Sequence, residues 1–351
     1  MLAHAIVASA GQAWPPFVLV AGLLLIGGVA AADGLFDALG ARLARTRLGG
    51  RSLLIALLAL VAVVTALLNL DTSVVFLTPV LVHAARQRGL DERPFLYGSV
   101  FMANAASLLL PGSNLTNLLV LRSEPQTGAS FAMQMLPAWI TACAITAAFT
   151  ATAFPLQEGE PAKTEPPPLR LGLGAAATLV AGVLVVALPN PALPVLVVAL
   201  PNAALPVLAV GLTATLLRRL RPRLDPRALA LLFVLAMGLG TLARLWRGPA
   251  HLLHASGTWT TAGIGVVASL LLNNLPAAVL LSPRPTAHPH ALLLGLNLGP
   301  NLAVTGSLSA VLWLQAARTV EARPSIATYS RLGVILVPLT IAGALVMHVP
   351  T

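Results

Sequence analysis

Charged residues are scarce in this chain of 351 residues. Asp, Glu, Lys and Arg together make up 9% of the sequence, whereas 57% is apolar and the mean hydropathy is +0.88. A soluble domain of this size could not shield so much hydrocarbon from water. Apolar runs of roughly 20 residues, long enough to cross about 30 Å of hydrocarbon, recur along the chain. The composition therefore predicts an all-α polytopic membrane protein.

Cysteine is almost absent. The one cysteine, Cys143, lies in an apolar stretch, which excludes disulfides within the chain and clusters of metal-binding thiolates. The sequence also lacks a recognisable set of metal ligands, a nucleophile beside a base and a phosphate-binding loop. We therefore expect no catalytic residues, no metal site and no cofactor.

Acidic residues number 11 against 21 basic ones, for a net charge of +10. In a soluble protein this excess would suggest nucleic acid as a partner. Here every Lys and Arg can be placed at or beyond the end of an apolar segment, which is typical of a topology signal and of contact with lipid headgroups. We expect the lipid bilayer, and no nucleic acid, as the partner of these charges. Residues 1–13 contain no Lys or Arg and so lack the basic start of a signal peptide, and we expect no cleaved signal peptide.

A polar, proline-rich stretch divides the chain. Residues 156–170 contain Pro161, the run Pro166–Pro168 and three glutamates, a composition typical of a linker. We predict two halves, 1–155 and 171–351, joined by a cytoplasmic linker.

Four apolar segments are interrupted by polar residues. Unpaired backbone is not tolerated against lipid and survives only where it lines a cavity enclosed by protein. Broken helices in corresponding places of two halves indicate a binding site. We predict that each half holds a re-entrant hairpin followed by a broken transmembrane helix. These are 52–85 and 95–121 in the first half, and 257–282 and 289–317 in the second.

The two halves also share sequence. Residues 67–79 match residues 271–283 at six of thirteen positions, and Asn104 and Gly112-Ser113 are echoed by Asn297 and Gly306-Ser307. A second, shorter duplication pairs 187–195 with 199–207, and its prolines predict a kinked helix and loop to which we attach no function.

Basic loops give an independent test of topology, because they stay cytoplasmic. Arginines within 42–51 precede the first hairpin, and arginines within 86–93 follow it, so both ends of that hairpin lie inside. When the remaining segments are placed by the same rule, the second hairpin opens from the outside. We therefore predict that the two halves have inverted topologies. This placement leaves four of the 21 basic residues outside: Arg122, Arg244, Arg247 and Arg284.

Asp71 is the one acid at the expected membrane depth. An ionisable group there costs about 2.5 to 3.5 kcal/mol on insertion scales and indicates function by default. We predict that Asp71 carries the coupling proton. A structural alternative is that Asp71 caps the half-helix that follows the break, and the two roles can coexist.

Amides and hydroxyls crowd the breaks around this acid. A single amide or hydroxyl side chain can simply bridge two helices, which stabilises their association by about 0.6 kcal/mol. The confinement of these side chains to four breaks is therefore what indicates a site. With no Lys or Arg at these depths, an anionic solute would depend on helix N-termini for its charge. We predict substrate or ion binding by Asn69, Thr72, Ser73, Asn104, Ser107, Ser113, Asn114, Asn117, Asn273, Asn274, Asn297, Asn301, Thr305 and Ser307, with Thr116 in the same breaks.

These breaks resemble those of the bacterial arsenite/antimonite efflux permeases, in the ion-transporter superfamily that also holds sodium-coupled dicarboxylate symporters. The resemblance runs from about Trp14 to the end. The stretches that carry it are Asp33-Gly34-Leu35-Phe36, Asn69-Leu70-Asp71 to Thr78-Pro79, Ala103-Asn104-Ala105-Ala106-Ser107 to Ser113-Asn114-Leu115-Thr116-Asn117, Asn273-Asn274-Leu275-Pro276, Gly295 to Pro300, and Gly306-Ser307-Leu308 to Trp313.

The resemblance implies a secondary transporter of a bacterial-type plasma membrane that exports arsenite or antimonite by proton antiport. Its partners would be a small inorganic solute and H⁺ (or Na⁺), with a homodimer and a soluble ATPase subunit as further expectations. Arsenous acid is mostly uncharged at neutral pH, so a cage of amides and hydroxyls could bind it.

The chain departs from that family at three ionisable positions. Asn104 and Asn297 stand where the permeases typically show Asp, and Asn301 stands where they show Lys. The chain also looks short at its N-terminus. Two alternatives therefore stay open: a sodium-coupled dicarboxylate or inorganic-anion symporter, and a non-transporting membrane sensor or assembly partner.

Overall fold

A computed structural model describes residues 1–121, 126–163, 165–188, 203–221 and 226–348. These residues form α-helices and short 3-10 helices, with no β-strand among them, which confirms the all-helical prediction. Of the described helices, four are long and apolar enough to cross a membrane, and a bent pair makes a fifth. The four are Leu2–Ala32, Gly50–Leu67, Gly128–Ala153 and Ile326–Met347.

The elements follow the chain in two sets. The first half contains α1 (Leu2–Ala32), α2 (Leu35–Arg45), α3 (Gly50–Leu67), α4 (Leu70–Gln87), α5 (Arg93–Ala106), η1 (Pro111–Ser113), α6 (Leu115–Val120) and α7 (Gly128–Ala153). The second half contains α8 (Leu173–Ala187), α9 (Ala204–Leu217), α10 (Pro226–Leu245), α11 (Gly248–His254), α12 (Thr258–Leu272), α13 (Asn274–Leu281), α14 (Pro289–Leu298), η3 (Gly299–Leu302), η4 (Val304–Gly306), α15 (Leu308–Thr319) and α16 (Ile326–Met347).

Two boundaries differ from those of the apolar segments in the sequence. The apolar segment 16–38 predicts one helix, whereas α1 begins at Leu2 and stops at Ala32, because Gly34 adopts a left-handed conformation (φ 73°) that separates α1 from α2. The apolar segment 228–246 predicts one crossing, whereas the helix there is followed by α11 at a bend of 72°. Most of the short duplication lies outside the described residues, since 189–202 fall in a gap.

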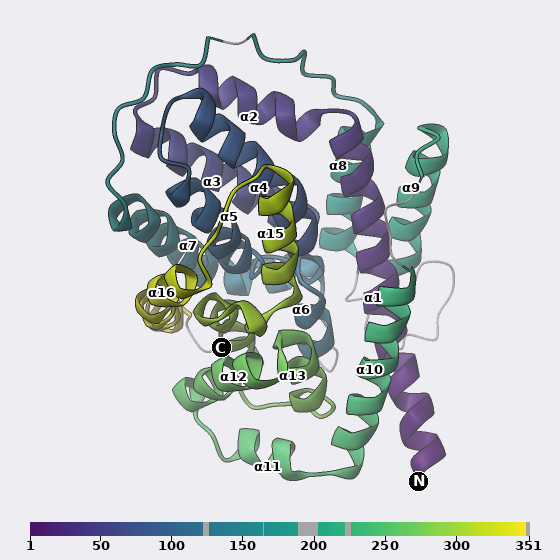
Figure 1. Cartoon of the computed structure of the whole chain (residues 1–351). Helices are drawn as coiled ribbons and strands as arrows, with labels where there is room; N and C mark the ends of the chain where they lie inside the picture. The colour runs from purple at the N-terminus through teal and green to yellow at the C-terminus, as the bar shows by residue number, and fades with distance from the viewer. Residues whose placement is uncertain (122–125, 164, 189–202, 222–225, 349–351) are drawn as a thin grey trace.

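Helix α1 is the centre of a layer at one side of the molecule. It packs against α8, α9 and α10, so this layer joins one helix of the first half to three of the second (Figure 1). The helices of the two predicted hairpins (α3, α4, α12 and α13) and the helices α5, α6 and α15 of the broken segments lie on the other side of α1 in the same view. The two breaks of the first half lie against α1, where Gly27 faces Thr72 and Leu23 faces Gly112.

The two helices that precede the broken segments are the most enclosed. All residues of α5 after Arg93 are buried, and so are Ala291 to Leu298 in α14. A helix that is apolar around its whole circumference is expected to be surrounded by other helices. Both helices therefore deliver the polar residues at their C-terminal ends into the interior of the protein.

Asp33 joins the layer at the end of α1. Its carboxylate accepts a hydrogen bond from the amide of Gly174 at 2.8 Å and forms an ion pair with Arg218. Gly174 lies at the start of α8 and Arg218 follows α9, so one carboxylate holds three helices together. The side chain of Asp33 is 1% exposed.

The linker is anchored by a buried arginine. Arg88, at the end of α4, donates hydrogen bonds to the carbonyl oxygens of Thr46 (3.0 Å), Leu48 (2.7 Å) and Gly159 (2.7 Å). Gly159 belongs to the linker, and Thr46 and Leu48 belong to the loop between α2 and α3. The guanidinium thus satisfies loop carbonyls that no helix pairs.

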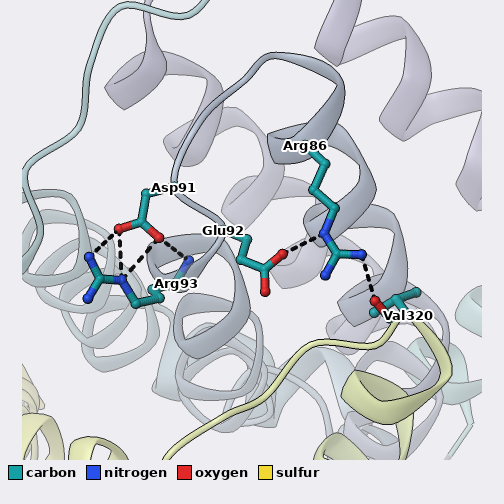
Figure 2. A network of polar contacts seen from close by, with 5 residues as sticks. All are labelled: Arg86, Asp91, Glu92, Arg93 and Val320. Carbon is teal, nitrogen blue, oxygen red and sulfur yellow. Dashed lines mark hydrogen bonds and ion pairs between the residues drawn. The ribbon is translucent and has the colours of Figure 1, made fainter.

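Two ion pairs lie in the loop between α4 and α5, and Figure 2 shows how differently they are used. Arg93 contacts Asp91 within the loop (2.6 Å), and although burial opposes it, this contact lowers the pKa of Asp91. Arg86 contacts Glu92 (2.5 Å) and also donates to the carbonyl of Val320 at 2.6 Å. Because Val320 follows α15, Arg86 connects the ends of helices from both halves.

Candidate functional site

Each helix that restarts after a break has a side-chain cap at its first turn. Such a cap satisfies backbone N–H groups that have no partner inside the helix. The caps are Asn69 Oδ1 to the Thr72 amide (2.7 Å) for α4, Asn114 Oδ1 to the Thr116 amide (3.1 Å) for α6, Asn273 Oδ1 to the Leu275 amide (3.4 Å) for α13, and Ser307 Oγ to the Ala310 amide (3.2 Å) for α15.

These caps correct the alternative prediction that Asp71 caps the half-helix that follows the first break. The break falls at Leu68 and Asn69, and Asp71 is already the second residue of α4. Asn69 is therefore the cap, and the carboxylate of Asp71 is left for another contact.

Three of the four caps are followed by a polar residue two positions later. The sequences are Asn69-Leu70-Asp71, Asn114-Leu115-Thr116 and Ser307-Leu308-Ser309. In each, the cap closes the helix end and the third residue lies one step into the first turn. The third residues all line one cavity of about 530 Å³.

We call this space the tip cavity. Its polar end is formed by Asp71, Thr72, Asn114, Thr116, Asn274 and Ser309. The rest of its wall is mainly apolar and comes from α1, α9, α10 and the neighbouring turns of α4 and α15, including Phe17, Val29, Phe76, Leu232 and Leu312. Helices of both halves thus contribute to one space.

Asp71 and Ser309 meet at the polar end. Ser309 Oγ donates a hydrogen bond to Asp71 Oδ1 at 2.9 Å, from α15 of the second half to α4 of the first. Asp71 is half-buried and, within the described residues, forms no ion pair. A carboxylate with a single hydroxyl partner is able to take up and release a proton.

Thr72 and Thr116 add two unused hydroxyls to this end. Both side chains are buried, and neither hydroxyl has a hydrogen-bond partner among the described residues. Thr72 reaches its position because Gly27 of α1 faces it, and a Cβ there would overlap with the Thr72 methyl group. Because buried polar groups usually have partners, these two hydroxyls are exceptions within the described residues.

Behind the tip cavity, the two broken helices are tied together by their amides. Asn297 of α14 accepts hydrogen bonds from Asn114 Nδ2 and from Ser107 Oγ (3.2 Å). Its own amide group donates to Asn117 Oδ1 at 2.8 Å. Asn297 is fully buried, and its polar atoms are used by these contacts.

A second amide pair lies beside it. Asn104 Nδ2 donates to Asn301 Oδ1 at 2.7 Å, and both residues are fully buried. We call the set Asn104, Ser107, Asn114, Asn117, Asn297 and Asn301 the amide junction. Of these six, Asn114 also lines the tip cavity, and it connects the two groups.

The structure thus separates the predicted ligands into three groups. Asp71, Thr72, Asn114 and Asn274 line the tip cavity; Asn104, Ser107, Asn117, Asn297 and Asn301 bond to one another or to nearby backbone. The remaining residues lie apart from both groups. Asn69, Asn273 and Ser307 are caps, Ser73 and Ser113 contact backbone carbonyls of α3, and Thr305 is exposed.

Ser309 is the residue that sequence reasoning missed. It lies inside a helical stretch, where a serine is usually a surface or back-bonded residue. The signal that could have found it is the repeated pattern of cap, Leu and polar residue, which also contains Asp71 and Thr116.

A likeness to a solved structure covers the whole fold. The crystal structure of the YdaH transporter of Alcanivorax borkumensis matches with a TM-score of 0.54 over 98% of this chain and 86% of that one. The two sequences are 18% identical, so the likeness shows the fold alone.

Among curated proteins, the silicon efflux transporter LSI3 of Oryza sativa subsp. japonica is 31% identical over 131 residues. The match covers 37% of this chain and 27% of that protein, so the chain aligns with about a quarter of this relative's length. A wider match comes from the family model described as CitMHS, citrate transporter, which spans residues 1–304. Because this match spans more than half of the chain, the chain belongs to the citrate transporter family.

Proposed function

We propose that the chain is a secondary active transporter that exports a small hydroxylated acid of the arsenite or antimonite type by proton antiport. The observation that carries this proposal is the carboxylate of Asp71 at the polar end of the tip cavity. It is bonded to Ser309 and to no described cation. A proton and a solute would then compete for the same polar end.

The chemistry of that end favours an uncharged solute. Its groups are amides, hydroxyls and one carboxylate, and no Lys or Arg is among them. An anion would be repelled by the ionised Asp71, whereas a neutral molecule with several hydroxyls can hydrogen-bond to all three kinds of group. The partial match to a silicon efflux transporter supports a solute of this kind.

A second candidate is a sodium-coupled dicarboxylate or inorganic-anion symporter. Helices α4, α13 and α15 begin at the tip cavity, and helix N-termini attract negative charge. The citrate transporter family supports this candidate too. It requires sodium or a proton to neutralise Asp71 when the anion binds.

Everted vesicles with an imposed gradient separate the two. We expect arsenite uptake driven by a proton gradient, unchanged when choline replaces sodium, and absent in Asp71→Asn. Asp71→Glu keeps the titratable group and should retain part of the flux. Sodium-dependent citrate or succinate transport without arsenite flux would favour the symporter instead. A folded wild type that moves none of these solutes would favour a sensor or assembly partner.

The surroundings of the transporter form a further part of this proposal. We place the chain in a bacterial-type plasma membrane, with a homodimer and a soluble ATPase subunit as candidate partners. Light scattering on the purified protein measures the dimer, and co-purification from the native membrane measures the subunit.

A further inference from the structure

The tip cavity reaches from the helix breaks to a basic loop. Its lining includes Ala31 and Ala32 at the end of α1, and Leu220 and Arg221 just after α9. Arg221 is exposed. The cavity therefore has a mouth at the end of the molecule where Asp33 joins α1, α8 and α9.

Two charged residues lie on the described wall of the tip cavity, and their charges have opposite signs. Asp71 lies at the polar end and Arg221 at the mouth. The surface between them is mainly apolar, and an apolar wall weakens the field of a charge less than water does. Arg221 has no ion-pair or hydrogen-bond partner among the described residues, so no described carboxylate neutralises its charge.

Its neighbours in the loop differ in this respect. Arg218 is paired with the buried Asp33. Arg219 carries the same charge as Arg221, but it does not line the cavity. A basic loop as such serves as a topology signal, which would make Arg219 and Arg221 equivalent, whereas the cavity wall distinguishes them.

A lone carboxylate in a water-filled cavity attracts any small cation. Sodium and potassium ions outnumber protons greatly in neutral solution, so a carboxylate that carries protons needs protection from them. A fixed positive charge at the mouth of a pore supplies such protection, since it raises the electrostatic barrier for cations. It leaves an uncharged solute unaffected.

We propose that Arg221 is an electrostatic filter that keeps sodium and potassium ions away from Asp71. This inference rests on the proposed role of Asp71 as the proton carrier. The charge of Arg221 repels protons as well as metal cations, but a carboxylate binds protons far more tightly than sodium, so the same repulsion leaves only the proton bound. Arg221 touches neither Asp71 nor the polar end, so it acts through the potential in the cavity.

The test measures sodium binding without any transported solute. The full chain is purified in detergent, and Tm is followed while NaCl replaces choline chloride at constant ionic strength. A cation that binds the folded state raises Tm. We expect no sodium effect in the wild type or in Arg219→Gln, and a rise of about 1 to 4 °C in Arg221→Gln. The double variant Arg221→Gln with Asp71→Asn should lose that rise.

Equal responses in Arg221→Gln and Arg219→Gln would overturn the proposal. So would a sodium-dependent rise in the wild type that disappears in Asp71→Asn, which would favour sodium as the coupling ion. The expected Tm pattern together with no arsenite flux in vesicles would leave the filter standing and contradict only the proposed solute. Potassium chloride in place of sodium chloride should give the same pattern.

Discussion

At the scale of single residues, the junction between the two broken helices is built from uncharged amides. Asn104 and Asn301 are hydrogen-bonded to each other at 2.7 Å across 197 positions of sequence. The resemblance to arsenite permeases places Asp at the first of these positions and Lys at the second. One neutral pair thus stands where an ion pair of opposite charges would fit.

A charge swap at this pair should therefore be cooperative. We expect Asn104→Asp and Asn301→Lys each to lower the folded yield and Tm, because a buried charge without a partner costs about 3 to 5 kcal/mol. The double variant should regain most of the loss, because the two charges can pair. Thermal unfolding in detergent measures the coupling between them.

A mismatched double variant provides the control. Asn104→Asp with Asn273→Lys places the cation at a cap that does not contact Asn104. The Tm of this mismatched variant should fall by no less than the sum of the changes in its two single variants. If the Asn301→Lys combination is equally poor, the two amides do not form an exclusive pair.

The sequence singles out Asp71 as a candidate because a charge within an apolar segment is conspicuous. It does not separate the amides that line the cavity from those of the amide junction. Both kinds have the same composition and lie in the same breaks, and only contacts such as Asn297 with Asn114, 183 positions apart, distinguish them. Ser309 was missed for the same reason, since its partner is 238 positions away.

At the scale of elements, α4 and α15 run side by side from the tip cavity to the loops at their far ends. Asp71 and Ser309 connect their first turns. Arg86 and Val320 connect their last residues, as Figure 2 shows. Two contacts at opposite ends make one helix from each half into a single unit.

The hydrogen bond from Arg86 to the carbonyl of Val320 should control local opening of the loop between α15 and α16. A hydrogen bond from a charged group contributes about 1.5 to 3 kcal/mol. We therefore expect Arg86→Gln to speed amide hydrogen exchange at residues 318–325 by about tenfold or more. The control variant Arg93→Gln removes the ion pair with Asp91, which lies within the loop between α4 and α5 and does not reach Val320. Faster exchange in both variants would show that the effect is not specific to the contact with Val320.

Asp33 allows a similar comparison in the layer around α1. Asp33→Asn keeps an oxygen that can accept from the Gly174 amide but loses the ion pair with Arg218. Asp33→Ala loses both. We expect Tm to fall in the order wild type, Asn, Ala, because an unsatisfied buried group costs about 1 to 3 kcal/mol. Equal values for Asn and Ala would mean that the contact with Gly174 contributes nothing.

Break positions were predictable from sequence because Asn and Ser before a leucine are strong helix-start signals. Helix lengths were not. The expected helix over 16–38 extends to Leu2, and α11 was not expected at all, since Gly248-Pro249 lies in a stretch without clear apolar periodicity.

At the scale of the whole molecule, the tip cavity opens toward one end. The positions of the basic loops predict that this end, which contains Arg218 and Arg221, lies in the cytoplasm. A cytoplasmic mouth of the tip cavity would make this structure a state that is open to the inside.

Thiol labelling tests the orientation directly, because Cys143 is the one cysteine in the chain. In a Cys143→Ala background, Leu220→Cys lies on the wall near the mouth and His251→Cys lies on α11. A membrane-impermeant maleimide should label Leu220→Cys from the cytoplasmic side only, and His251→Cys from the outside only. The reverse pattern would invert the predicted topology.

The uncharged amide junction also has an electrical consequence. Moving one elementary charge across 100 mV changes the free energy by about 2.3 kcal/mol. Asn104, Asn297 and Asn301 carry no charge, so these side chains can shift through the membrane field without the electrical work that ionised side chains would require. The voltage dependence of the transport cycle would then report the protonation of Asp71 and the charge of the solute, with no contribution from ionised side chains of the amide junction.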